Sequence, residues 1–421
     1  MPTKSTRGLT LSQRAPGFSA VLAVPEFRAL WFAEAQSVFG DQLAKVALTI
    51  LVYDRSGSAL LAATVYALTF LSALAGGLGL SQLADRFPRR PLMVTCTLAQ
   101  SVVVGLMALP GMPLPVLCAL VFAIGLIQSP ALAAQNAVTR EVFTDDELYL
   151  RSQDLRGITT NTLMLLGLAG GGVLVVALGT SWALAIDAVT FLVSAVVVRW
   201  YVKNRRTAGS SEDGWFTAAR WVFGNRRMRL LLTLSWLVGL VVIPEGLVAP
   251  LAEELGATDA AVGWLLAADP LGFVIGTYVL SRFVTAENRI RIMGVLATCS
   301  SATLIAFALT PHVSIAIVLL ALAGAFGAYQ ITVSATFNTV VPNEIRGGAY
   351  GVIRTGLRVS QGIGVAIGGA VAELIGSSTA TIALAGLLGV LIAVPATVAW
   401  ARSNRSVSDV RLTPNLNTLP S

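Results

Sequence analysis

The sequence predicts an all-α membrane protein with twelve transmembrane helices arranged as two pseudo-symmetric six-helix bundles. Three observations lead to this fold class: an apolar composition, a series of long apolar stretches, and short basic segments between them. Of the 421 residues, 55% are hydrophobic and only 12% are charged, which is too apolar for a soluble protein of this length. The chain is therefore expected to have the lipid bilayer as its solvent.

Each apolar stretch is long enough to cross a hydrocarbon layer of about 30 Å as an α-helix. The first six stretches cover residues 28–53, 58–81, 91–110, 114–138, 155–178 and 181–201. The second six cover residues 229–251, 259–283, 292–310, 313–340, 348–375 and 378–401. They predict an N-terminal bundle over 27–201 and a C-terminal bundle over 229–401.

The basic residues predict how the chain is oriented. With both termini in the cytoplasm, all but two of the 29 lysines and arginines fall on the cytoplasmic side, the exceptions being Lys45 and Arg55. Positive charge in short loops strongly favours that side of a membrane. We therefore predict a multi-pass protein of the cell inner (plasma) membrane with both termini cytoplasmic. The net charge of +7 then reflects orientation, and nucleic acid is not an expected partner.

Three polar segments complete the predicted organisation. They are an N-terminal cytoplasmic segment at 1–26, a cytoplasmic linker at 202–228 and a cytoplasmic tail at 402–421. Within the linker, aromatic residues from Trp215 to Phe223 are interleaved with arginines. This pattern predicts a short interfacial helix on the cytoplasmic leaflet.

The two predicted bundles also share short sequence patterns. Gly171-Gly172 in the fifth helix recurs as Gly368-Gly369 in the eleventh helix, 197 positions later. Arg86-Phe87 after the second helix recurs as Arg282-Phe283 after the eighth. Parallel repeats of this kind are related by an axis along the membrane normal, with a site between them near the midplane.

A basic loop carrying one acid follows the second predicted helix. Leu83-Ala84-Asp85-Arg86 and Arg89-Arg90 in this loop match most of the pattern G-x-L-A-D-R-x-G-R-R of the major facilitator superfamily, although Ser81 and Pro88 replace its glycines. Phe39-Gly40-Asp41, the glycines from Gly167 to Gly172, and Val341-Pro342 add to the likeness. From about residue 27 to 400 the chain resembles the drug-exporting branch that includes macrolide-efflux proteins and an enterobactin exporter.

This resemblance implies the major facilitator fold and alternating access, with helices 1, 4, 7 and 10 lining a central cavity. It also implies proton antiport and multidrug efflux. One element departs from the family pattern, because many antiporters have a Gly-Pro pair where this chain has Gly167-Leu168.

Ionisable residues inside membrane helices are the first candidates for function, since each costs at least a few kcal/mol unless it faces a cavity or a partner. Glu34, Asp41 and Lys45 lie on one face of the first helix. Asp41 falls near the midplane and is the best candidate for a proton or cation site. The alternative is that Lys45, four residues later, neutralises Asp41 in a structural pair.

Three further acids lie inside predicted helices. Glu245 belongs to Pro244-Glu245-Gly246 in the seventh helix, where proline and glycine should loosen the helix. Asp269 precedes Pro270 in the eighth helix and is either functional or a stabiliser of a kink. Asp187, by contrast, is expected to be structural and close to the outer surface.

Polar and aromatic residues on the candidate cavity helices would suit a bulky, mainly apolar ligand with a few hydrogen-bonding groups. These predicted cavity-lining residues are Gln36, Gln128, Trp236, Tyr329, Gln330, Phe337 and Asn338. For any single one of them, simple packing is the alternative.

The acid of the basic loop suggests a conformational latch. Asp85 would face the positive N-terminus of the eleventh helix, near residues 343–348, and favour the inward-closed state. Arg86, Arg89, Arg354 and Arg358 would extend this latch through pairs with cytoplasmic acids. In the alternative interpretation the basic loop only sets the topology.

The sequence as a whole predicts a secondary active transporter that exports a hydrophobic drug-like, antibiotic or siderophore-like small molecule by proton antiport. The alternatives are a nutrient uptake symporter or uniporter, and a non-transporting membrane sensor or scaffold. The sequence contains no phosphate-binding glycine-lysine loop, nucleophile–base set or metal-ligand spacing, so an enzyme, ATP drive, a cofactor and a metal are not expected. The expected partners are the small molecule, protons and the lipid bilayer, and the expected state is a monomer.

Overall fold

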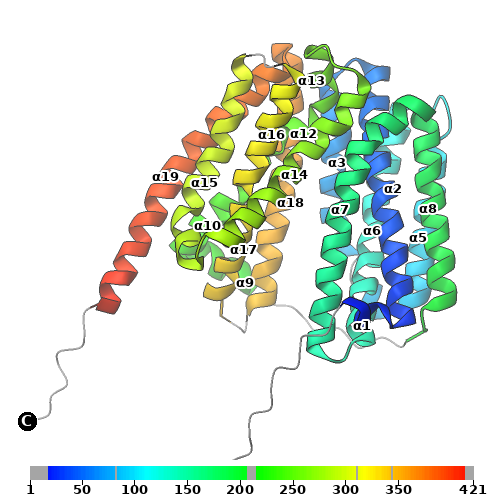
Figure 1. The fold of residues 1–421 in the computed structure, drawn as a ribbon, viewed down its shortest axis with the longest axis horizontal. Coiled ribbons are helices and arrows are strands. Elements are labelled where there is room, and N and C mark those ends of the chain that lie inside the picture. Colours follow the sequence, from blue (N-terminus) through cyan, green and yellow to red (C-terminus); the bar gives the residue numbers. More distant parts are fainter. Residues whose placement is uncertain (1–17, 81–82, 206–214, 310–311, 343–344, 413–421) are drawn as a thin grey trace, which may run out of the picture.

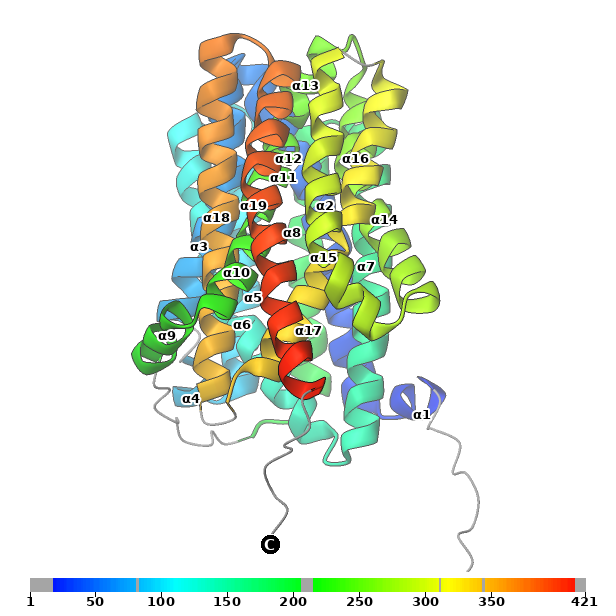
Figure 2. The same ribbon diagram turned by 90° about the vertical axis from the view of Figure 1, so that its left-hand side faces the viewer.

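The computed structural model describes residues 18–80, 83–205, 215–309, 312–342 and 345–412, and every regular element in these ranges is a helix (Figure 1). The first set contains α2 (Pro25–Ser56), α3 (Ala59–Gly79), α5 (Arg89–Met107), α6 (Leu114–Val142), α7 (Asp146–Leu178) and α8 (Thr180–Tyr201). The short helices α1 (Phe18–Leu22) and α4 (Leu83–Arg86) lie at the end of the molecule that carries the termini (Figure 2).

The second set begins with a helix broken into α10 (Arg226–Trp236), α11 (Val238–Val241), α12 (Ile243–Gly246) and α13 (Val248–Glu254). It continues with α14 (Asp259–Phe283), α15 (Ala286–Ile305) with the 3₁₀ turn η1 (Ala306–Leu309), α16 (Val313–Gly327), α17 (Tyr329–Val340), α18 (Arg346–Ile375) and α19 (Ser378–Leu412). Helix α9 (Trp215–Gly224) precedes this set.

The fold is an all-α membrane fold with twelve transmembrane helices, as predicted. Within the described part of the chain, ten helical segments are long and apolar enough to cross a membrane. The other two crossings are α2 and α18, which contain 32 and 30 residues. At 1.5 Å per residue these two helices are about 48 and 45 Å long, more than the bilayer requires.

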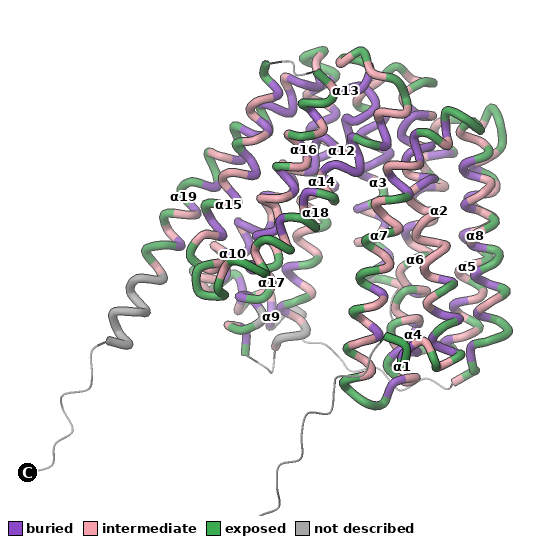
Figure 3. Tube along the Cα trace, in the orientation of Figure 1, coloured by how far each residue is buried: buried purple, intermediate pink, exposed green. Residues whose placement is uncertain are grey.

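The outer surface of the helices is apolar, as a lipid-facing surface must be. Exposed residues lie around the circumference of the molecule, whereas buried residues concentrate between the helices (Figure 3). Large apolar side chains among the exposed ones include Trp200, Phe283 and Leu374, which is 87% exposed. Such a surface would make a water-soluble protein aggregate, whereas the lipid chains of a bilayer solvate it.

The two sets of helices meet along two seams. Helix α3 packs against α18, and α7 packs against α14 (Figures 1 and 2). The second glycine of each duplicated pair lies in a seam: a Cβ atom on Gly172 would lie 2.6 Å from the carbonyl oxygen of Ala260, and one on Gly369 would lie 3.3 Å from that of Ala59. The sequence repeat therefore corresponds to matching close contacts between the two sets.

The predicted weakness of the seventh transmembrane helix is confirmed. Its axis is interrupted at Leu237, Val242 and Leu247, and Pro244 supplies no amide hydrogen at the start of α12. Backbone groups freed by such a break need partners inside a membrane. The hydroxyl of Tyr329 donates to the Leu234 carbonyl over 2.8 Å, so a side chain from α17 satisfies this segment.

The linker helix α9 forms as predicted but does not present all of its apolar side to lipid. Ala218 and Val222 are completely buried in a cluster with Met228, Val352 and Ile353. Helix α9 packs against α18 and α10, as Figure 2 shows for α9 beside α18. The second half of the linker is therefore held by the second set of helices.

Candidate functional site

A cavity of about 400 Å³ lies on the first set of helices at mid-height and is closed on one side by α18. Its ionisable wall residues are Asp41, Lys45, Tyr66, Asp187 and Arg358. Gln128 of α6 also lies in this wall. The remaining lining is largely aliphatic and aromatic, so a few charged groups face an otherwise apolar space.

A second cavity of about 450 Å³ lies on the second set of helices. Glu245 and Asp269 line it, together with Tyr329 and Gln330 of the broken tenth transmembrane helix. Gln330 donates to the carbonyl oxygen of Ser235 over 3.0 Å, so its amide also supports the break between α10 and α11. The remaining walls come mainly from valine, leucine, isoleucine and phenylalanine side chains.

Glu245 connects the two cavities and the two sets of helices. Its Oε2 lies 3.6 Å from the Nζ of Lys45, and it accepts a hydrogen bond from the hydroxyl of Tyr66. The same Lys45 Nζ lies 4.5 Å from the centre of the Tyr66 ring, within the range of a cation–π interaction. Lys45 is thus shared between an acid and an aromatic ring, and Asp41 is not its ion-pair partner in this structure.

Asp41 contacts Gln128 of α6 and not Lys45, the partner that spacing along its own helix predicted. Gln128 Nε2 lies 3.5 Å from its Oδ2, at the long limit of a hydrogen bond. Asp187 of α8 lines the same cavity and interacts electrostatically with Asp41. The expectation that Asp187 lies near the outer surface is therefore wrong: it lies at the level of Gly40, against which its carboxylate packs.

Glu34, the third ionisable residue predicted for this face, forms a two-pronged ion pair with Arg156 of α7. Arg156 Nε and Nη2 lie 2.6 and 2.8 Å from the two oxygens of Glu34, and both side chains are mostly buried. Fork-shaped pairs of this type are geometrically specific. Arg156 was counted among the cytoplasmic arginines, whereas it lies inside the bundle beside a membrane acid.

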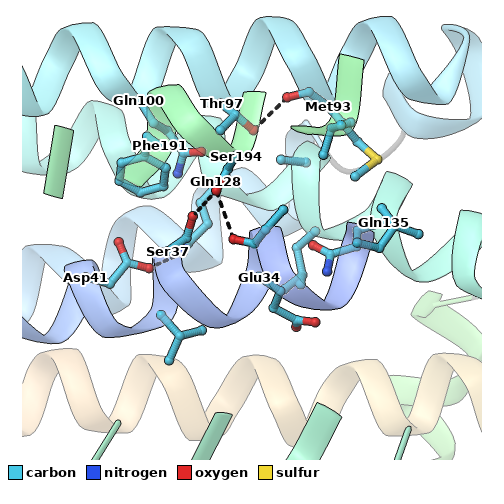
Figure 4. Close-up of a pocket in the computed structure, with 16 residues that line it drawn as sticks. Glu34, Ser37, Asp41, Met93, Thr97, Gln100, Gln128, Gln135, Phe191 and Ser194 are labelled. Carbon is cyan, nitrogen blue, oxygen red and sulfur yellow. Dashed lines mark hydrogen bonds between the residues drawn. The ribbon is translucent and has the colours of Figure 1, made fainter. Parts of the chain in front are cut away.

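Glu34 and Asp41 share one wall of a smaller cavity of about 120 Å³ enclosed by the first set of helices (Figure 4). Ser37 and Ser194 are joined across it by a hydrogen bond of 2.7 Å. The Nε2 atom of Gln100, a residue that is 3% exposed, has no hydrogen-bond partner among the described residues. Polar side chains therefore line this cavity along α2 from Glu34 to Asp41.

Several predicted cavity residues have packing roles instead. Gln36 donates to Ser194 Oγ over 3.0 Å and thereby joins α2 to α8. The Trp236 ring packs against Gly356 of α18, and Phe337 is completely buried in the second core cluster. The side chain of Asn338 lies outside the described residues. These outcomes follow from helix rotation, which a hydropathy pattern fixes only coarsely.

The predicted latch residues are spread over the molecule. The side chain of Asp85 lies outside the described residues, so its latch role stays a prediction. Arg86 and Arg354 are exposed, and Arg89 pairs with Glu141 within the first set of helices. Arg358 is not at the cytoplasmic end. Its guanidinium lies 5.8 Å from the centre of the Phe70 ring, in the wall of the cavity of about 400 Å³.

The end of the molecule remote from the termini is closed by hydrogen bonds between the two sets. Tyr53 donates to Glu253, and Glu373 accepts from Ser58 Oγ at 3.0 Å and from the Leu60 amide at 3.2 Å. At the opposite end the two sets of helices diverge (Figure 1).

Three residues of this site were missed or misjudged by sequence reasoning, namely Tyr66, Arg156 and Asp187. Tyr66 and Arg156 carried no motif, and only their places in apolar runs could have drawn attention to them. Asp187 carried a usable signal, because a carboxylate inside a membrane helix is costly at any depth. The depth of Asp187 in the bundle does not follow from its distance along the chain to the nearest loop.

Comparisons with known proteins agree with this architecture. The family model described as Major Facilitator Superfamily matches residues 30–244 and 245–415. A search of curated proteins finds no match.

Solved structures similar to the chain include the nucleoside transporter NupG, with 14% identity, a TM-score of 0.69 and coverage of 89% of this chain and 98% of that one. A bacterial homolog of the human lysosomal transporter Spinster, in an inward-facing and unoccupied conformation, has 14% identity, a TM-score of 0.70 and coverage of 93% and 99%. The POT family transporter PepTSo has 15% identity, a TM-score of 0.66 and coverage of 92% and 99%.

Proposed function

Because the chain belongs to the Major Facilitator Superfamily, we propose that it is a secondary active exporter of a hydrophobic drug-like, antibiotic or siderophore-like molecule, driven by proton antiport. The observation that carries the proposal is the set of four carboxylates lining two apolar cavities at mid-height, Asp41, Asp187, Glu245 and Asp269. Only Glu245 has an ion-pair partner among the described residues.

The chemistry of the cavities supports this assignment. Their combined lining is dominated by aliphatic and aromatic side chains, which favours a ligand with a large apolar surface. Amide groups of Gln128 and Gln330 offer a small number of hydrogen bonds. Buried carboxylates without a fixed cation can bind a proton, and they can also bind a positively charged group of a substrate.

The contacts between the two sets support an alternating-access cycle. The hydrogen bonds of Tyr53 and Glu373, the ion pair of Lys45, and the glycine seams lie in the halves of their helices remote from the termini. We infer that the structure is an inward-facing state of a monomer whose termini lie in the cytoplasm. Transport then requires these contacts to break as the two bundles rock.

Uptake of a nutrient by symport or uniport is the second candidate. The structures named above include a nucleoside transporter and a POT family transporter, but at 14–15% identity they support the fold and not a substrate. Buried acids serve either direction of coupled transport. The apolar lining of both cavities favours export of a lipophilic solute over uptake of a polar one.

The direction is tested in cells that overproduce the chain and are loaded with a lipophilic fluorescent dye. Export predicts less retained dye than in cells producing Asp41→Asn, and recovery of dye when the proton gradient is collapsed. Asp146→Asn is the matched control, because that acid is exposed and pairs with Arg140 at the surface. Energy-dependent accumulation of solutes, with no compound of a broad panel extruded, would contradict export.

A further inference from the structure

Asp187 is a buried acid without an ion-pair partner among the described residues. It is 2% exposed, and its Oδ1 accepts a hydrogen bond from Thr190 Oγ1 over 3.2 Å. It takes part in none of the ion pairs of the described chain. A permanently ionised carboxylate in this position would be unfavourable, because burial penalises its charged form.

The packing of α8 on α2 holds this acid next to Asp41. A Cβ atom on Gly40 would lie 2.6 Å from Thr190 Oγ1 and would overlap the Asp187 carboxylate, so only glycine lets the two helices approach this closely. The side chain of the next residue, Asp41, enters the same cavity as Asp187. The two carboxyl groups therefore border one largely apolar space.

The surrounding charged groups are already engaged elsewhere. On α2, Lys45 lies against Glu245 and the Tyr66 ring, and Glu34 is held by Arg156. Arg358 of α18 lies over the Phe70 ring. Lys45 and Arg358 line the same cavity, but the hydrogen-bond donors of the two acids among the described residues are the neutral groups of Gln128 and Thr190.

We propose that Asp41 and Asp187 form one proton-carrying site that holds a single proton between the two carboxyl groups during the transport cycle. Two neighbouring carboxylates in a poorly polar space cannot both be ionised at low cost, so they share a proton and titrate as a unit. Asp187 is a proton-carrying residue in this arrangement and not a structural acid of a peripheral helix. This inference rests on the proposed proton coupling and names the residues that perform it.

The smaller cavity extends from this site along α2 towards the end of the molecule that carries the termini. It runs along α2 from Glu34 to Asp41, and the unpartnered amide of the buried Gln100 lies in its wall. A volume of about 120 Å³ has room for a few water molecules, which need polar partners of this kind. A proton can thus reach Asp41 within the first bundle, apart from the Glu245 and Asp269 cavity.

The test combines a transport assay with a measurement that needs no transport. In proteoliposomes, solute-dependent proton flux should fall at least tenfold in Asp187→Asn, in Asp41→Asn and in the double variant. The proton flux of the double variant should be no lower than that of the more impaired single variant. Asp259→Asn, which changes an acid at the start of α14 away from both cavities, is the control and should retain wild-type proton flux.

Infrared spectra of the purified protein, recorded as a function of pH, measure carboxyl protonation directly. In Asp187→Asn the pH midpoint of the remaining carboxyl band should move by at least one pH unit, because the like charge opposite Asp41 is gone. An unchanged midpoint, wild-type proton flux in Asp187→Asn, or independent multiplicative losses in the double variant would overturn the proposal. If the wild type moves no protons with solute while the midpoint still shifts, the shared site stands and the proposed antiport fails.

Discussion

Lys45 of α2 and Glu245 of α12 form an ion pair of 3.6 Å that joins the two halves of the protein near the centre of the membrane. The side chains are 28% and 21% exposed, because both border the central cavities. The pair is reinforced by Tyr66, which hydrogen-bonds to the acid and faces the lysine. A contact between the halves at this level is made in one conformation of the transporter and must change in the other.

The first prediction concerns this pair. Glu245→Gln should weaken the state with a closed outer end by about 1 kcal/mol, which is about a fivefold change in the ratio of the two states. Distances between spin labels at the outer ends of α3 and α18 would measure the shift. The exchange variant Lys45→Glu/Glu245→Lys should restore the wild-type distribution, whereas identical distributions in all variants would exclude a conformational role for the pair. Glu287→Gln, in a surface pair within α15, is the control.

The second prediction concerns Glu34 and Arg156. Glu34→Gln leaves the mostly buried Arg156 without its acid, and the expected loss of stability is about 3 kcal/mol. The thermal unfolding midpoint in detergent should fall by several degrees, and Glu34→Gln/Arg156→Gln should recover part of this loss. If Glu34→Gln is as stable as the wild type but loses proton-coupled transport, Glu34 belongs to the coupling machinery and not to the framework.

The third prediction concerns the seam between α7 and α14. In Gly172→Ala the added methyl group would lie 2.6 Å from the Ala260 carbonyl oxygen, and backbone cannot move aside as a flexible side chain can. The outer ends of the halves should separate, which favours the outward-open state and slows transport. Labelling of cysteines placed on the two faces would show greater outer accessibility. Gly170→Ala is the matched control, since nothing lies within 4 Å of a Cβ atom there. Equal labelling of the two variants would contradict a role of the seam in the conformational equilibrium.

The fourth prediction concerns Glu254 at the end of the broken helix remote from the termini. Partial burial alone would raise its pKa, but hydrogen bonds from Thr379 and Ser377 and from the amides that begin α19 outweigh this effect and lower the pKa below 4.5. A depressed carboxyl pKa stabilises the folded state above the ordinary value near 4.5, and the stabilisation is lost as pH falls through the lowered pKa.

Thermal unfolding between pH 3 and 7 provides the check on Glu254. The wild type should lose more stability than Glu254→Gln on acidification, since the amide has no charge to lose at the N-terminus of α19. Glu287→Gln, at an exposed position of α15, should lose as much stability on acidification as the wild type does. Parallel curves for the wild type and Glu254→Gln would show that the contact contributes no pH-dependent stability.

The sequence alone was sufficient for the fold class, the order of the twelve crossings and the weak point in the seventh helix. Each of these depends on local chemistry: the length of an apolar stretch, the position of a proline, or the charge of a short loop. It also singled out Asp41, Glu245 and Asp269, because an acid inside an apolar stretch is visible without any knowledge of its neighbours. The structure then placed all three in cavity walls.

The partners of the charged residues were decided only by the tertiary structure. Spacing along α2 suggested that Lys45 neutralises Asp41, yet Lys45 lies against Glu245, 200 positions away in the chain. Asp187 was placed near the surface by counting from its loop, yet the close packing of α8 on Gly40 brings it beside Asp41. Helix tilt, rotation and the distance of closest approach set these pairs, and they depend on contacts between segments that are remote in sequence, so no local pattern contains them.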